Sequence, residues 1–135
     1  MYKRQVIYRN GFWHLFRSED DSYIVIQLGI STDIPIPGDY DVDGLTDFAV
    51  FRGTEGSEQP DFFILHAADF SFAGAAWGIP NDIPVVADYD GDGKTDIAVF
   101  RPSTNDWYLL QSSKGFRAVN YGVKGDRPIP NAFNP

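Results

Sequence analysis

Asp88-Tyr89-Asp90-Gly91-Asp92-Gly93-Lys94-Thr95-Asp96 is an acidic segment whose pattern also occurs 49 positions earlier, as Asp39-Tyr40-Asp41-Val42-Asp43-Gly44-Leu45-Thr46-Asp47. Both copies continue alike, into Phe48-Ala49-Val50-Phe51-Arg52 and Ile97-Ala98-Val99-Phe100-Arg101. Both are also preceded by a glycine and then, four residues later, by Asp-Ile-Pro. Self-similarity at a fixed period of about 50 residues indicates a repeat fold, in which each unit packs against its neighbours.

A third copy is divided between the two ends of the chain. Val6-Ile7-Tyr8-Arg9 matches the segment after the acidic loop, and Gly122 with Asp126-Arg127-Pro128-Ile129-Pro130 matches the segment before it. The acidic loop itself is absent there, and residues 131–135 stand in its place. We therefore divide the chain into a partial blade (6–38), two repeats (39–87 and 88–131) and a degenerate end (132–135). Residues 1–5 resemble a translated sequencing-library transposon end, and we expect them to be a non-native leader.

Short strand-like segments recur within each repeat, and no segment has a sustained helical period. Gly and Pro punctuate these segments, as expected for strands joined by tight turns. Four antiparallel strands repeated every 40–50 residues are typical of a β-propeller blade. The sequence therefore predicts an all-β fold, a partial propeller of two to three four-stranded antiparallel blades, with the acidic segments as hairpin turns. The expected strands are residues 6–9, 47–52 and 96–101; 12–17, 61–66 and 106–111; 23–28, 70–77 and 116–121; and the Ile-Pro segments ending at residues 39 and 88.

Composition excludes several classes of partner and site. The formal net charge is −8, which disfavours nucleic acid as a partner, because binding phosphates requires the opposite sign. The absence of cysteine excludes disulfides and thiolate zinc sites. No apolar run approaches the length needed to cross a bilayer, so we expect no membrane insertion.

The chemistry of the two acidic loops points to calcium. Calcium takes six to eight oxygen ligands at about 2.3–2.6 Å, and carboxylates at alternate loop positions can all face one ion. A glycine at the sixth position permits the sharp turn, after which a backbone carbonyl and a last carboxylate close the site. The alternative is a plain acidic surface turn, but four like charges in identical register in both loops favour a bound cation. We expect two Ca²⁺ sites: Asp39, Asp41, Asp43, Leu45 (carbonyl) and Asp47; Asp88, Asp90, Asp92, Lys94 (carbonyl) and Asp96.

Other calcium loops fit less well. An EF-hand requires a glutamate at its twelfth position and helices on both sides, but Val50 and Val99 occupy that position here. A dockerin-type module fails for the same reason. The chain resembles instead the FG-GAP repeats, also called VCBS repeats, most specifically at residues 38–52 and 87–102. That resemblance implies calcium-bearing propeller blades, as in integrin α-subunit heads and many bacterial secreted proteins, with one structural Asp-x-Asp-x-Asp-Gly-x-x-Asp loop per blade. The chain departs from the family in its loop-less last copy and in having too few repeats for a closed ring.

Three further sets of residues recur or stand out. Trp13, Phe62 and Trp107 share one position and are expected to pack between blades, with sugar stacking as the alternative. The arginines at positions 9, 52 and 101 are expected to pair with an acidic group or carbonyl of their own blade. His14 and His66 have no identifiable third ligand, and we expect them to be solvated or packed.

No catalytic motif is present, and we expect the chain not to be an enzyme. We expect a calcium-binding module of a secreted or surface protein, extracellular in location, that mediates adhesion or binds a protein or glycan ligand. Two alternatives are a non-catalytic accessory region of a larger extracellular hydrolase or lyase, and a carbohydrate-binding lectin that uses Trp13 and Trp107. Unpaired sheet edges also predict further blades, supplied by a longer chain or by homo-oligomerisation.

Overall fold

The computed structural model describes residues 4–56 and 58–130, and its secondary structure there is entirely β. No helix long and apolar enough to cross a membrane occurs in these residues. The predicted leader falls partly, and the predicted degenerate end wholly, outside the described residues. The strands are β1 (Arg4–Arg9), β2 (Phe12–Arg17), β3 (Ser22–Gln27), β4 (Ile34–Pro35), β5 (Phe48–Phe51), β6 (Phe62–Leu65), β7 (Phe72–Ala75), β8 (Ile83–Pro84), β9 (Ile97–Arg101), β10 (Asp106–Gln111) and β11 (Gly115–Asn120).

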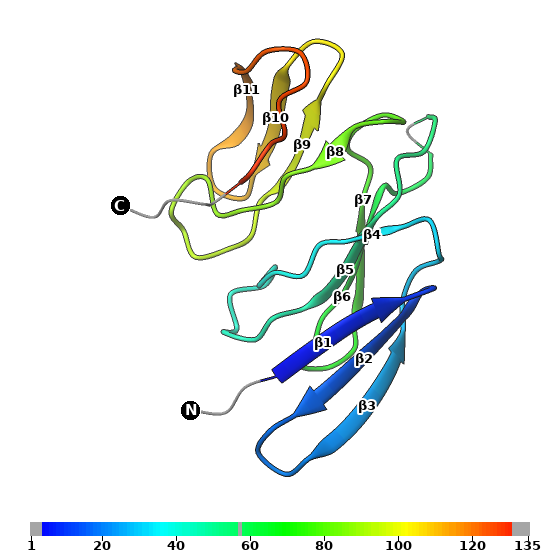
Figure 1. The fold of residues 1–135 in the computed structure, drawn as a ribbon. Coiled ribbons are helices and arrows are strands. Elements are labelled where there is room, and N and C mark those ends of the chain that lie inside the picture. Colours follow the sequence, from blue (N-terminus) through cyan, green and yellow to red (C-terminus); the bar gives the residue numbers. More distant parts are fainter. Residues whose placement is uncertain (1–3, 57, 131–135) are drawn as a thin grey trace.

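These strands form three antiparallel sheets that follow one another along the chain (Figure 1). The first sheet has the order β1-β2-β3, the second β4-β5-β6-β7, and the third β11-β10-β9-β8. The predicted all-β partial propeller is confirmed, with two four-stranded blades and one of three strands. Each acidic loop separates the innermost strand of a sheet from the next strand, so a sheet combines the end of one sequence repeat with the beginning of the next.

The innermost strands β4 and β8 are short because each contains a proline, which cannot donate a backbone hydrogen bond to its neighbour. Pairing nevertheless continues beyond the named strands. The amide of Ile36 donates to the carbonyl of Ala49 at 2.8 Å, and the amide of Val85 donates to the carbonyl of Ala98 at 2.9 Å. The two segments that flank each acidic loop are therefore hydrogen-bonded to each other close to the ends of the loop.

The core lies between successive sheets. Trp13 of the first sheet packs on Phe48 and Val50 of the second, with the Trp13 and Phe48 ring centroids 5.4 Å apart. Phe62 of the second sheet shares a cluster with Val99 of the third. Trp13 and Phe62 are 3% and 0% exposed, so the predicted packing role is confirmed for both. A sheet covered on both faces buries every residue of its central strand, as β5 does.

Buried aspartates tie each innermost strand to the arginine that follows its loop. Both oxygens of Asp33 accept hydrogen bonds from Arg52 at 2.7 Å, and both oxygens of Asp82 accept from Arg101 at 2.9 Å. The two aspartate side chains are fully buried. The predicted pairing of these arginines within their own blades is confirmed.

Replacing one of these buried carboxylates tests how much the aspartate–arginine pair contributes to stability. Asp33→Asn retains the shape but removes the charge that Arg52 pairs with, so we expect a loss of about 3 kcal/mol in the free energy of unfolding. Urea denaturation followed by tryptophan fluorescence measures the change. The matched control, Asp20→Asn, alters an exposed turn carboxylate and should change stability by less than about 0.5 kcal/mol. Equal losses in the two variants would contradict the structural role of the buried pair.

Candidate metal centre

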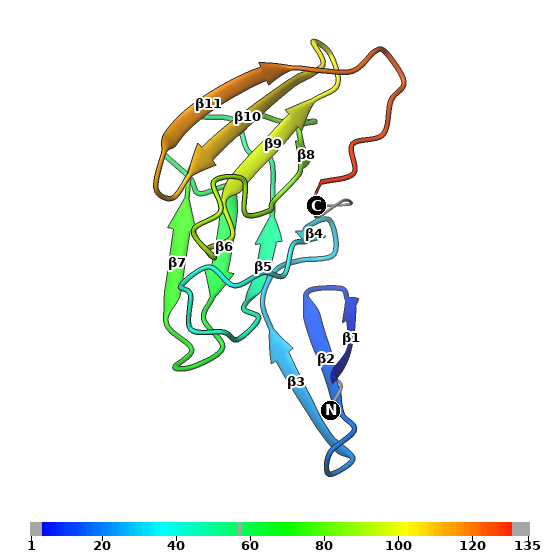
Figure 2. The ribbon, with the colours of Figure 1, turned by 90° about the vertical axis from the view of Figure 1, so that its left-hand side faces the viewer.

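Each acidic segment forms a closed turn between two neighbouring strands. Loop 1 (residues 39–47) connects β4 to β5, and loop 2 (residues 88–96) connects β8 to β9. Isolated bridges between Gly38 and Asp47 and between Ala87 and Asp96 close the two mouths. The predicted hairpin placement of both loops is confirmed, and the two loops occupy equivalent places in successive sheets (Figure 2).

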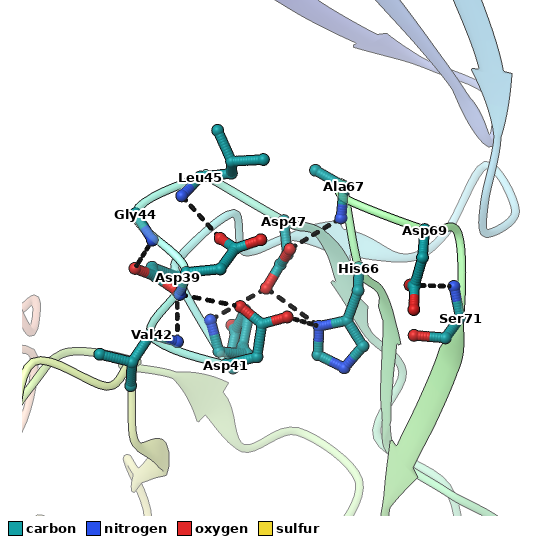
Figure 3. A network of polar contacts seen from close by, with 12 residues as sticks. Asp39, Asp41, Val42, Gly44, Leu45, Asp47, His66, Ala67, Asp69 and Ser71 are labelled. Carbon is teal, nitrogen blue, oxygen red and sulfur yellow. Dashed lines mark hydrogen bonds and ion pairs between the residues drawn. The ribbon is translucent and has the colours of Figure 1, made fainter.

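The first aspartate organises the backbone of its loop. Asp39 accepts hydrogen bonds from the amides of Val42 at 2.7 Å and Gly44 at 3.0 Å (Figure 3). Asp88 accepts in the same way from Gly91 at 2.7 Å and Gly93 at 2.9 Å. The glycine at the sixth position of each loop has a positive φ, +83° and +89°, which lets the chain reverse without a Cβ clash.

The third and fifth positions repeat one local turn. Asp43 accepts from the amide of Leu45 at 2.7 Å, and Asp92 accepts from the amide of Lys94 at 2.8 Å. Each of these aspartates uses one oxygen for the amide two residues ahead, as short polar side chains in turns commonly do. The same relation links Asp41 to the amide of Asp43 at 3.2 Å. Local sequence alone therefore bends both loops around their carboxylates.

The last aspartate of each loop is buried and joins the loop to the rest of its sheet. Asp47 is 1% exposed and accepts from the amide of Tyr40 at 3.0 Å and from that of Ala67 at 2.8 Å. Asp96 is buried to the same degree and accepts from the amides of Tyr89 and Ser112 at 2.8 and 2.7 Å. These carboxylates connect the start of each loop with the residues just after the neighbouring strand, β6 or β10.

The carboxylates converge, but not all four of each loop at once. Oxygens of Asp39, Asp41 and Asp43 lie within 4.8 Å of one another in loop 1. In loop 2 the group is Asp88, Asp90 and Asp96, so the buried ninth position takes part there in place of the fifth. The predicted carbonyl ligands, Leu45 and Lys94, lie in their loops at the expected place, with their amides bonded as described. That their carbonyl oxygens coordinate an ion stays a prediction.

Side chains from outside the loops also reach the carboxylates. His66, expected to be solvated or packed, places its Nδ1 atom 3.2 Å from Asp47 and 3.3 Å from Asp41 (Figure 3). The three residues form a further group whose ligand atoms lie within 4.8 Å of one another. Sequence reasoning missed this contact because His66 follows β6, 19 residues after Asp47. Its only sequence signal is its place just after the strand that pairs with β5.

In loop 2, two serine hydroxyls reach a carboxylate of the loop from outside it. The Ser112 hydroxyl donates to Asp92 at 2.6 Å, and the Ser113 hydroxyl donates to the same carboxylate. These hydrogen bonds, that of Ser112 foremost, lower the pKa of Asp92 to about 2. Asp92 therefore stays ionised at neutral pH, as a cation ligand must be. Neither serine belonged to the predicted site.

Residues 81–111 match the family model of the FG-GAP repeat. This segment is similar to an FG-GAP repeat. The match extends from the turn before β8, through loop 2, to the end of β10, so it contains the whole second acidic loop and its flanking strands. No curated protein and no solved structure matches the chain significantly.

The two loops differ in the residue at one position of left-handed backbone. Val42 has φ +65°, a left-handed conformation that is strained for a β-branched residue, whereas its counterpart in the matched repeat is Gly91 at φ +78°. A Cβ on Gly91 would meet no atom within 4 Å. Both positions share the left-handed backbone, so the difference between them is the strain that valine carries in that conformation and not the space around it.

Exchanging these residues tests that strain. We expect Gly91→Val to lower the free energy of unfolding by about 1–2 kcal/mol, and Val42→Gly to raise it by up to about 1 kcal/mol. Urea denaturation in the presence of a calcium chelator measures both effects. The control is Val25→Gly on β3, where φ is negative and glycine should destabilise the strand. A loss of stability in Val42→Gly comparable to that of the control would contradict the strain.

Proposed function

We propose that this chain is a calcium-binding propeller repeat module in which loop 1 and loop 2 each hold one Ca²⁺. The observation that carries the proposal is the convergence of three carboxylates within each hairpin turn, at positions 1, 3 and 5 of loop 1 and at positions 1, 3 and 9 of loop 2. Carboxylates and backbone carbonyls are the hard oxygen donors that calcium prefers. The assigned ligands remain Asp39, Asp41, Asp43, Leu45 (carbonyl) and Asp47 for one ion, and Asp88, Asp90, Asp92, Lys94 (carbonyl) and Asp96 for the other.

Calcium would act here on the fold and not on a substrate. Each loop concentrates four negative charges on a nine-residue turn, and a divalent cation offsets their mutual repulsion. Because Asp47 and Asp96 also accept hydrogen bonds from amides just after β6 and β10, an ion held by them would connect the hairpin to the neighbouring strand of its sheet. At about 100 times Kd, each independent site would add roughly 2.7 kcal/mol to stability.

We further propose that the module belongs to a secreted or surface protein and works outside the cell. Extracellular calcium modules bind with Kd of about 10⁻⁴–10⁻³ M, which suits calcium levels there. A structural ion in successive blades leaves the other surfaces of the sheets for adhesion or for a protein or glycan ligand. Because the acidic groups recur in both repeats, they fit a structural role better than a catalytic one, and we propose no enzymatic activity.

Calorimetry tests the calcium proposal directly. Titration of Ca²⁺ into chelator-treated protein should show two sites, and Asp90→Asn with Asp92→Asn should remove one of them, since loop 2 loses two ligand charges. Saturating calcium should raise the Tm of the unaltered chain by roughly 5 °C or more.

The control makes the same change of charge elsewhere. Asp20→Asn with Asp21→Asn neutralises two exposed carboxylates in the turn between β2 and β3, and both calcium sites should persist. No heat of binding in the unaltered chain, or equal Tm values with calcium and with chelator, would remove calcium from the account.

A further inference from the structure

The first sheet has an open edge where the other two sheets carry a strand. By the sequence repeat, β1 corresponds to β5 and β9, which pair with the Ile-Pro strands β4 and β8. In the described residues β1 pairs only with β2. Its apolar side chains are correspondingly uncovered: Ile7 is 57% exposed, whereas its counterparts Val50 and Val99 are fully buried.

Residues 122–130, which follow β11, already have the conformation that precedes such a strand. Gly29, Gly78 and Gly122 all have φ between +105° and +118°. One residue later, the amides of Ile30, Ile79 and Val123 each donate at 2.9 Å to the aspartate that lies three residues further on. That aspartate is Asp33, Asp82 or Asp126 in the respective copy. The third copy of the turn is thus formed without a paired strand after it.

The charges of the two uncompleted parts are complementary. Asp33 and Asp82 are buried and paired with arginines, whereas Asp126 is exposed. Among the described residues, the only hydrogen bond to the Asp126 carboxylate comes from the amide of Val123. Arg9 corresponds to Arg52 and Arg101, is exposed, and has no ion pair within the described residues. Each member of the recurring pair is therefore present and lacks its partner.

The shapes are complementary as well. A Cβ on Gly29 would lie 3.2 Å from Val50, and one on Gly78 would lie 3.3 Å from Val99, so each glycine receives a valine of the following sheet. At Gly122 only Asp126 comes within 4 Å. Beside that glycine lies a groove of about 250 Å³ lined also by Phe100 and Trp107. The side chain that corresponds to the two valines is Ile7.

The two parts do not meet within one chain. The second sheet packs against the first sheet on one side and against the third on the other. Figure 1 shows residues 121–130, in red, alongside the third sheet, with β1 at the opposite end of the array. A second copy can bring them together.

We propose that residues 122–130 of one chain add to the free edge of β1 in a second copy, as the missing innermost strand of the first sheet. Asp126 then pairs with Arg9, and Ile7 covers Gly122. Each chain so completed contributes three four-stranded blades. Rings of propeller blades contain four to eight, so two chains close one six-bladed ring through two identical head-to-tail contacts. This interaction surface goes beyond the proposed calcium function and does not depend on it.

The molecular mass in solution is the first test. Light scattering on the eluting peak of the 135-residue chain should give twice the chain mass. Arg9→Asp faces Asp126 with a like charge, so it should halve that mass while the β-sheet circular dichroism is retained. The control, Arg117→Asp, makes the same change on the exposed outer strand β11 and should remain a dimer.

A cross-link tests the register. In the second sheet Pro35 lies opposite Val50, and by correspondence Pro128 of one chain should lie opposite Ile7 of the other. The chain has no cysteine of its own. A mixture of Ile7→Cys chains with Pro128→Cys chains should therefore form a disulfide-linked pair on oxidation, whereas Arg117→Cys mixed with Pro128→Cys should not.

Three results would overturn the proposal. One is a monomeric unaltered chain at micromolar concentration, which would leave the β1 edge to another occupant, such as a preceding segment of a longer protein. The others are a dimer that Arg9→Asp does not weaken, and an absence of the Ile7→Cys to Pro128→Cys cross-link in a dimer.

Discussion

The buried carboxylates of Asp47 and Asp96 are the contacts on which the rest of each blade depends. Each accepts one hydrogen bond from an amide of its own loop and one from an amide just after the neighbouring strand, β6 or β10. A buried carboxylate without such partners would destabilise the fold, because it would lose its hydrogen bonds to water and gain none from the protein. The loop, the strand after it and the end of the neighbouring strand are therefore fixed together.

This arrangement separates the two duties of the acidic loops. The aspartates at positions 1, 3 and 5 of a loop shape the turn by accepting hydrogen bonds from local amides. The aspartate at position 9 anchors the turn to the sheet. The loops are not equivalent in their surroundings, since His66 reaches the carboxylates of loop 1 and two serine hydroxyls reach Asp92 of loop 2. These contacts are the physical basis on which the two proposed calcium sites would differ in affinity.

Stacking of the sheets supplies the stability that no single blade can supply. Trp13 and Phe62 lie between neighbouring sheets, whereas Trp107 packs only on its own sheet. The Asp33–Arg52 and Asp82–Arg101 pairs hold each innermost strand on its own sheet. The two ends of the array have no such neighbour. The exposure of Ile7 and Asp126 is the direct result, because each is one half of a contact that the middle of the array repeats.

The sequence by itself determined the fold class, most strand positions and the two hairpin loops. The reason is local: alternating aspartates with a following glycine dictate a turn, and flanking apolar segments at a constant period dictate strands. It also indicated the pairing of Arg52 and Arg101 within their blades, although not that Asp33 and Asp82 are the partners. For Arg9 the same prediction is not met among the described residues, where it is exposed and has no ion pair. Only the tertiary structure decided that His66, Ser112 and Ser113 reach the loops, that Val42 is strained, and that Ile7 and Asp126 are exposed while their counterparts in the other copies are buried. Such contacts join residues far apart in the chain, and the register and packing of the sheets, which no local pattern encodes, bring them together.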